Sequence, residues 1–349
     1  MNRLACWLGL LWLISGGMAQ GLTYQYVAKI GSENQLTQLF YEGKEMVAVR
    51  YYDNGNVIKE EGQVPDGIHI GQLNGRIIEE STYANGKRNG KTVKYHDNNA
   101  IKSTSFYVGD QLEGVMTQYD ANGGKLSDVT YQNGVEHGTY SAYFPTGAIS
   151  RRGTLQKGAL EGAYTTYYES GVTKNHRMYQ RNQLDGPNEQ YNPQGLLIQR
   201  ALYQQGQLHG LLQQFNDKGL PVIDALFESG NMIQRWVYQP PGQLHLMESL
   251  QNNRRQGRTV QYRENGDMEW EGYYADGLKE GIETHYFNDG NPAQVIRYTK
   301  GKKDGTALYF SDKTGYLEME VGWQDDKKRM VTRYLENGTK GITQLIPPY

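Results

Sequence analysis

The sequence predicts an all-β protein made of tandem β-hairpins, and three periodic features support this prediction. Glycine recurs every 24 residues, and an aromatic residue stands five positions after each of these glycines. A second aromatic residue follows at seventeen positions in most repeats. The periodic glycines are Gly90, Gly114, Gly138, Gly162, Gly186, Gly210, Gly257, Gly281 and Gly305. A fixed period of this length indicates a repeat architecture, so we expect about a dozen repeats in an elongated antiparallel sheet or solenoid.

One repeat, residues 114–138, shows why each segment should form its element. Residues 115–119 alternate with period two and carry β-branched and aromatic side chains, which is typical of a strand. Residues 120–123 (Asp-Ala-Asn-Gly) have turn chemistry, because Asn-Gly tolerates the positive φ angles of hairpin turns. Residues 125–131 then read as the return strand. We expect residues 132–138 to turn the chain into the next repeat.

Two further positions carry a pattern. The residue before each periodic glycine is polar, and a polar-Gly pair predicts a tight turn there. These polar residues are Asn89, Glu113, His137, Glu161, Asp185, His209, Glu280 and Asp304. The position fifteen residues after the glycine is small or aliphatic, which predicts packing against the aromatic rings of neighbouring hairpins. It holds Ser105, Val129, Gly153, Ala201, Ala225, Gly272 and Ile296, with Arg177 as the exception.

Composition agrees with a thin sheet structure. Hydrophobic residues make up 37% of the chain, and 28 tyrosines against 7 phenylalanines supply much of that share. A tyrosine buries its ring while its hydroxyl stays near water, which suits an interior that is never far from solvent. The 43 glycines disfavour helices, in which each glycine costs about 1 kcal/mol relative to alanine.

Residues 1–19 resemble a secretory signal peptide, with Arg3, an apolar run over 4–14, and small residues before a cut after Ala19. An uncleaved anchor is the alternative, although eleven apolar residues are short for a span of roughly 20. Cys6, the only cysteine, lies in this segment, so the mature chain would have no disulfide and no cysteine metal site. We expect an exported protein, either periplasmic or secreted to the cell surface.

The formal net charge is −2 at pH 7, and no long basic run occurs. Nucleic acids and anionic membranes require a concentrated positive face. Neither nucleic acid nor strong membrane binding is therefore expected.

The repeat resembles the MORN repeat over residues 40–340, and is closest to its bacterial variant. The resemblance is carried by Tyr51-Tyr52-Asp53-Asn54-Gly55, Tyr167-Tyr168-Glu169-Ser170-Gly171, Tyr262-Arg263-Glu264-Asn265-Gly266 and similar segments. It implies an array of β-hairpins used as a scaffold or binding surface, usually without catalysis, and some bacterial members are described as antitoxin-like. The YD repeat of large secreted shells is an alternative, because Tyr119-Asp120-Ala121-Asn122-Gly123 resembles its core.

Departures from the pattern suggest the domain organisation. Residues 20–45 fit the pattern poorly and should form an N-terminal cap before an array over 46–230. In the repeat that starts at Asp66, Gly71 replaces the first aromatic residue. Residues 231–256 contain Pro240-Pro241 and form a degenerate repeat, read either as a bend or special surface, or as a drifted repeat without a role. Residues 257–349 should resume the array and end in a C-terminal cap.

No catalytic, cofactor-binding or metal-binding residues are predicted. The seven histidines share no metal-ligand spacing, and two of them, His137 and His209, occupy turn positions. Adjacent carboxylates such as Glu79 and Glu80 point to opposite faces of a strand, so they cannot act as a glycosidase pair. We therefore expect that the protein is not an enzyme and uses no cofactor.

Aromatic residues outside the two fixed positions are the candidates for contact with a partner. They are Tyr140, Tyr164, Tyr168, Trp236, Trp270, Tyr273, Tyr309 and Trp323. Tyr140 and Tyr164 share a position in consecutive repeats, which predicts that they lie side by side. The function expected first is a scaffold that binds another protein through an elongated β surface. The alternative is a module that binds a glycan or cell-wall polysaccharide. A homodimer through the open sheet ends is a further option.

Overall fold

The computed structural model describes residues 21–28 and 35–347, so the predicted signal peptide lies outside the described residues. The described residues form 32 strands and no helix, which confirms the predicted fold class of tandem antiparallel β-hairpins. This part of the chain accordingly contains no helix with the length and hydropathy needed to span a membrane. The chain divides into two compact units. The N-terminal unit runs to Ile149 and includes Leu155–Gly158, and the C-terminal unit contains Ser150–Thr154 and the chain from Ala159 onward.

In the N-terminal unit, β1 to β4 pair antiparallel in chain order, and β5 to β8 do the same. β1 pairs in parallel with β5 and so joins the two groups, and β8 continues the sheet to β10. The strands of this unit are β1 (Leu22–Ala28), β2 (Gln35–Glu42), β3 (Glu45–Asp53), β4 (Asn56–Gly62), β5 (Gly67–Leu73), β6 (Arg76–Ala84), β7 (Lys87–Tyr95), β8 (Ile101–Val108), β9 (Gln111–Leu112), β10 (Gly114–Tyr119), β11 (Lys125–Gln132) and β12 (Val135–Tyr143). The boundary between the two units falls within β13 (Ile149–Gln156).

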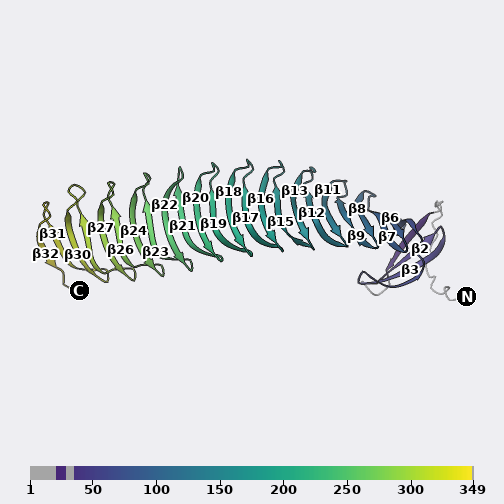
Figure 1. The fold of residues 1–349 in the computed structure, drawn as a ribbon, viewed down its shortest axis with the longest axis horizontal. Coiled ribbons are helices and arrows are strands. Elements are labelled where there is room, and N and C mark those ends of the chain that lie inside the picture. Colours follow the sequence, from purple (N-terminus) through teal and green to yellow (C-terminus); the bar gives the residue numbers. More distant parts are fainter. Residues whose placement is uncertain (1–20, 29–34, 348–349) are drawn as a thin grey trace. The chain divides into compact units, whose positions relative to one another are not determined.

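In the C-terminal unit the strands stand side by side in chain order (Figure 1). They are β14 (Ala159–Leu160), β15 (Gly162–Tyr167), β16 (Thr173–Gln180), β17 (Gln183–Tyr191), β18 (Leu197–Gln204), β19 (Gln207–Phe215), β20 (Pro221–Glu228), β21 (Asn231–Gln239), β22 (Gln243–Gln251), β23 (Arg254–Tyr262), β24 (Met268–Ala275), β25 (Leu278–Lys279), β26 (Gly281–Tyr286), β27 (Pro292–Thr299), β28 (Lys302–Lys303), β29 (Gly305–Phe310), β30 (Leu317–Gln324), β31 (Lys327–Tyr334) and β32 (Lys340–Leu345).

Two kinds of turn alternate along the chain. Asn133 and Gly134 have φ angles of 51° and 78° and join β11 to β12, which is the geometry of a type I′ hairpin turn. At the other end of the hairpin, Asp120 opens a five-residue loop in which its amide donates to the Gly124 carbonyl at 2.8 Å. The Asp120 carboxylate accepts from the amides of Asn122 and Gly124, each at 2.8 Å. The turn predicted over 120–123 is therefore confirmed.

The periodic glycine lies inside a strand or at its start, so the prediction of a tight turn at the polar-Gly pair was wrong. Gly186 lies within β17 with a φ of 107°, where an L side chain is strained. A Cβ at Gly186 would stand 3.1 Å from Cβ of Met178, eight residues earlier, and one at Gly138 would stand 3.2 Å from Cβ of Thr130. Glycine recurs because its positive φ excludes a side chain, and at positions such as Gly138 and Gly186 close packing excludes one as well.

The polar residue before that glycine joins neighbouring hairpins. A carboxylate oxygen of Glu113 accepts from the amide of Asn133 at 2.8 Å, and Glu280 does the same for Lys300 at 2.7 Å. The next amide in the same turn, Gly134, donates to the Leu112 carbonyl at 2.8 Å. In these repeats the two-residue turn is thus held by the preceding hairpin.

Strand alternation gives the sheet of the C-terminal unit two faces. The first, here the aromatic face, carries the second aromatic residue of each repeat and the small residues at position fifteen. Ala201 and Ala225 are buried there. A Cβ added to Gly153 would stand 2.7 Å from Cδ2 of Tyr164, so the ring lies directly over the glycine. The predicted packing of a small residue against an aromatic ring is confirmed at this position.

The N-terminal unit begins with an antiparallel meander of β1 to β4. β1 also pairs in parallel with β5 and so joins the meander to the strands that follow. The core of this unit contains Tyr24, Phe40, Ala48, Val64 and Tyr83. Tyr24 occupies the space above Gly71, because a Cβ there would stand 2.5 Å from Cε2 of Tyr24. The aromatic ring that the repeat lacks at residue 71 is thus supplied by β1.

The segment over 231–256 retains hairpin structure. β21 and β22 pair from Gln234 with Ser249 to Gln239 with Gln243, and the turn between them contains a cis Pro240-Pro241 bond. The predicted bend at this segment stays a prediction.

Candidate functional site

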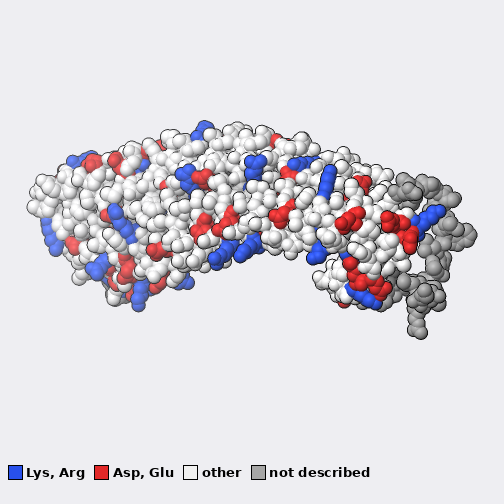
Figure 2. Space-filling model, turned by 45° about the vertical axis from the view of Figure 1, so that its right-hand side comes forward, with Lys and Arg blue, Asp and Glu red and all other residues white. Residues whose placement is uncertain are grey.

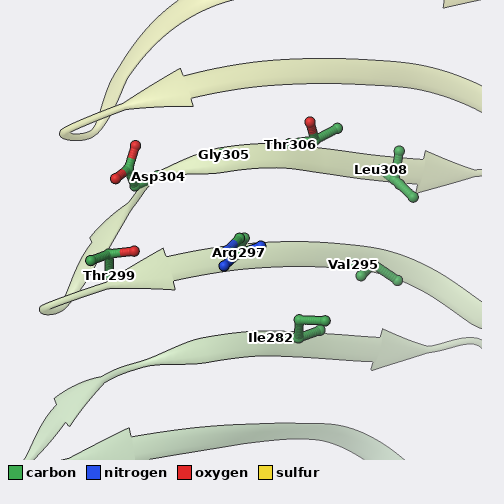
Figure 3. A pocket seen from close by; sticks show the side chains of 8 residues that line it. All are labelled: Ile282, Val295, Arg297, Thr299, Asp304, Gly305, Thr306 and Leu308. Atoms are coloured by element: carbon green, nitrogen blue, oxygen red, sulfur yellow. The ribbon is translucent and has the colours of Figure 1, made fainter.

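A groove of about 520 Å³ crosses β26, β27 and β29 on the face opposite the aromatic face (Figure 3). Ile282, Val295 and Leu308 supply apolar surface, and Arg297 and Asp304 supply opposite charges. Its other lining residues are Thr299, Gly305 and Thr306. We call this side of the C-terminal unit the groove face. The groove combines apolar surface with polar and charged groups, so it could contact both parts of an amphipathic ligand.

The repeat departs from its pattern at the groove. Fourteen residues after the periodic glycine, other repeats carry a polar residue, and some of these accept a hydrogen bond from a tyrosine of the next repeat. Tyr286 donates to Glu271 at 2.7 Å, and Tyr143 donates to Asp128 at 2.6 Å. Val295 holds this position in the groove. In the next repeat, Phe310 stands at the position that holds the hydrogen-bonding tyrosine elsewhere. Carboxylate and hydroxyl are both absent here, and Val295 contributes apolar surface to the groove.

Electrostatics distinguish the groove from the repeat before it. Burial opposes ionisation of Glu271, but hydrogen bonds from Tyr286 and Arg258 outweigh it and hold the carboxyl pKa below its ordinary value. Burial, followed by the Glu271 carboxylate, raises the pKa of Tyr286 to about 12. In the groove, Arg297 forms no ion pair with any described residue. Its guanidinium is therefore free to meet a partner.

Apolar side chains continue along the groove face. Pro187 lies opposite Leu202, and Leu211 lies opposite Leu226. Leu202 is 42% exposed, and Ile282 in the groove is 52% exposed. Basic and acidic side chains are interspersed over the surface in Figure 2. Apolar surface among mixed charges suits contact with another protein better than contact with a polyanion.

Residues 112–133 match the family model of the MORN repeat variant. This match supports a MORN-repeat assignment. MORN repeats are generally non-catalytic, and the described residues contain no group of three or more His, Cys, Asp or Glu side chains that could hold a metal ion. The matched segment comprises a hairpin of the N-terminal unit, β10 with β11, which shows the alternating turns described above.

No curated protein matches this chain. Two solved structures are similar to it, each at 12% sequence identity: the crystal structure of TcdB2-TccC3-Cdc42 and that of TcdB2-TccC3 without the hypervariable C-terminal region. The matches cover 87% and 89% of this chain, with TM-scores of 0.15 and 0.18. The chain spans only 19% and 17% of the lengths of those chains. Similarity at this level carries no functional argument.

The aromatic residues predicted for partner contact do not form one site. Tyr164, Trp270, Tyr309 and Trp323 lie on the aromatic face, Trp236 and Tyr273 lie on the groove face, and Tyr168 begins a five-residue loop. Tyr140 lies in the N-terminal unit and Tyr164 in the C-terminal unit.

Several of these rings already take part in internal contacts. Trp270 donates from Nε1 to Gln261 at 2.9 Å, and Tyr168 donates to the Tyr191 carbonyl at 2.9 Å. Tyr273 differs, because it is 47% exposed on β24, the strand beside β26 of the groove. Sequence reasoning missed the groove residues. The available signal was Val295, which is apolar at a position where most other repeats carry a polar residue.

Proposed function

We propose that the protein is an exported, non-enzymatic MORN-repeat scaffold that binds another protein through the groove face of its C-terminal unit. The observation that carries this proposal is the groove, where apolar Ile282, Val295 and Leu308 lie beside Arg297 and Asp304. A partner side chain with an apolar body would be desolvated there, and the two charges would orient it.

Cations that lie against the aromatic rings favour a protein partner over a glycan. Sugar binding by stacking requires open ring faces. On the aromatic face, Lys279 lies 4.8 Å from the Tyr298 ring centre, and Lys303 lies 4.8 Å from that of Trp323. Arg255 lies 5.2 Å from the ring centre of Tyr274. These rings already have cations against them.

The repeat itself provides a variant that fills the groove. Val295→Glu with Phe310→Tyr recreates the Glu271–Tyr286 pair of the preceding hairpin, so the variant should fold like the parent. A photo-crosslinking amino acid at exposed Thr306 on the groove face should capture a discrete protein in the native compartment. The same probe at exposed Lys328 on the aromatic face is the control.

The double variant should abolish capture at Thr306. Equal capture from Thr306 and Lys328, or capture unchanged by the double variant, would contradict the groove as the contact site. Capture of a second copy would instead favour a homodimer. Export is tested separately by N-terminal sequencing of the mature protein, which should begin at Gln20.

A further inference from the structure

Arg177 breaks the pattern of the aromatic face. It occupies position fifteen of its repeat, on β16, where the hairpins on either side carry Gly153 and Ala201. Its cross-strand neighbours are Tyr164 on β15 and Asn188 on β17. A long cationic side chain therefore stands between two small residues of its row.

The fold supplies no counter-ion for this arginine. Its Nε is buried, and no described residue accepts a hydrogen bond from it. Arg177 also forms no ion pair with any carboxylate of the described residues. A partly buried charge without a partner is unfavourable, so the position favours an external anion.

Arg235 provides a comparison within the same row. It lies across from Ala225 on one side and Glu248 on the other. Glu248 is 2% exposed and forms ion pairs with Arg235 and, at 2.8 Å, with Arg255. The repeat thus provides an internal carboxylate for one arginine of the row and none for the other.

The surroundings of Arg177 suit a peptide. Asn188 lies beside it, and the amide side chains of Asn175 and Gln190 form the next cross-strand pair on the same face. Side-chain amides both donate and accept hydrogen bonds, as an extended peptide backbone requires. Ala201, beyond Asn188, is fully buried and projects little above the sheet.

We propose that Arg177 binds a carboxylate, and that its occupant is an aspartate or glutamate side chain in an extended segment of the protein partner. The planar guanidinium matches a carboxylate with two parallel hydrogen bonds. The proposal rests on the scaffold function. It places a second contact on the aromatic face, opposite the groove.

The test uses the complete mature protein and a synthetic peptide of alternating threonine and glutamate, with glutamine replacing glutamate in the control peptide. Arg177→Ala introduces the residue present at the same position in the next two repeats, so it should fold. The glutamate peptide should bind the parent protein, and both Arg177→Ala and the glutamine peptide should weaken binding by about tenfold or more. Arg200→Ala removes a cation on the groove face that is paired with Glu189 at 2.9 Å, and should change binding by less than about twofold.

Equal affinity of the two peptides, or of the parent and Arg177→Ala, would overturn the proposal. Binding of an oligogalacturonate without binding of the glutamate peptide would overturn the peptide occupant. If Arg177→Ala does not fold, protection of Arg177 from phenylglyoxal by the glutamate peptide, mapped by mass spectrometry in the parent protein, decides the question. Val295→Glu with Phe310→Tyr should leave peptide affinity unchanged. The experiments therefore distinguish a wrong proposal for the groove from a wrong proposal for the Arg177 site.

Discussion

The Tyr24 ring fills the space beside Gly71, so substitutions at the two positions should have destabilising effects that partly cancel. Tyr24 is fully buried, and its ring lies where a side chain on residue 71 would stand. Tyr24→Ala removes a large core side chain and should cost about 3–5 kcal/mol of unfolding free energy. Gly71→Ala should cost about 1–3 kcal/mol, because its Cβ overpacks against the Tyr24 ring. Gly71 has no positive φ, so the substitution adds no backbone strain.

Together the two changes should cost less than their sum. Once Tyr24→Ala has emptied the space, the Cβ at residue 71 no longer meets a ring. The coupling should equal most of the Gly71→Ala penalty, about 1–3 kcal/mol. In the Tyr24→Ala background, Gly71→Phe should restore more unfolding free energy than Gly71→Ala, because it places a ring at the repeat's first aromatic position.

The assay is hydrogen exchange of amides in β1, β5 and β6, with urea unfolding as a second measure. Local exchange is needed because repeat proteins open in parts, and a single global midpoint would average over them. Penalties that add within about 0.5 kcal/mol would show that Tyr24 does not occupy the space above Gly71.

Three further predictions concern single positions. Burial holds the pKa of His69 below its ordinary value of 6.5, and its Nε2 donates to the Pro65 carbonyl. The stability contribution of neutral His69 is therefore complete above the unfolded pKa and falls as pH drops below about 6.5, and His69→Gln should remove this dependence in pH-dependent urea unfolding. Gly186→Ala should destabilise its hairpin by about 1–3 kcal/mol in thermal unfolding, whereas Gly272→Ala, without positive φ and with neighbours at 3.6 Å, should not. Glu248→Ala should cost about 3–5 kcal/mol, because it leaves two arginines without their buried carboxylate; loss of less than about 1 kcal/mol in chemical unfolding would contradict this role.

Local patterns predicted the hairpins well. Alternation over 115–119 and the Asp120 loop depend on residues close together in the chain, so their chemistry is readable directly. The periodic glycine misled because it is required by a positive φ within the strand and, at Gly138 and Gly186, by a side chain eight residues earlier across the hairpin. The polar residue before it misled for a similar reason, since its partner lies in the following turn.

The candidate site was harder to predict. Sequence reasoning selected exposed-looking aromatic residues, but Trp270 and Tyr168 are engaged in hydrogen bonds within the fold. At the groove, Val295 and Phe310, fifteen residues apart, stand where the preceding hairpin has Glu271 and Tyr286. The significance of either residue appears only when the Glu271–Tyr286 contact is known.

The sequence by itself determined the 24-residue period, the all-β class and the places where the chain can reverse, because strand alternation and turn chemistry act between near neighbours. Only the tertiary structure decided that several periodic glycines are sites of close packing, that Tyr24 completes the repeat at Gly71, that Val295 lines a groove, and that Arg177 lacks the counter-ion given to Arg235. Each of these depends on which side chains of different strands meet on one face. That pairing is set by sheet register and by the β1–β5 connection, which no single repeat encodes.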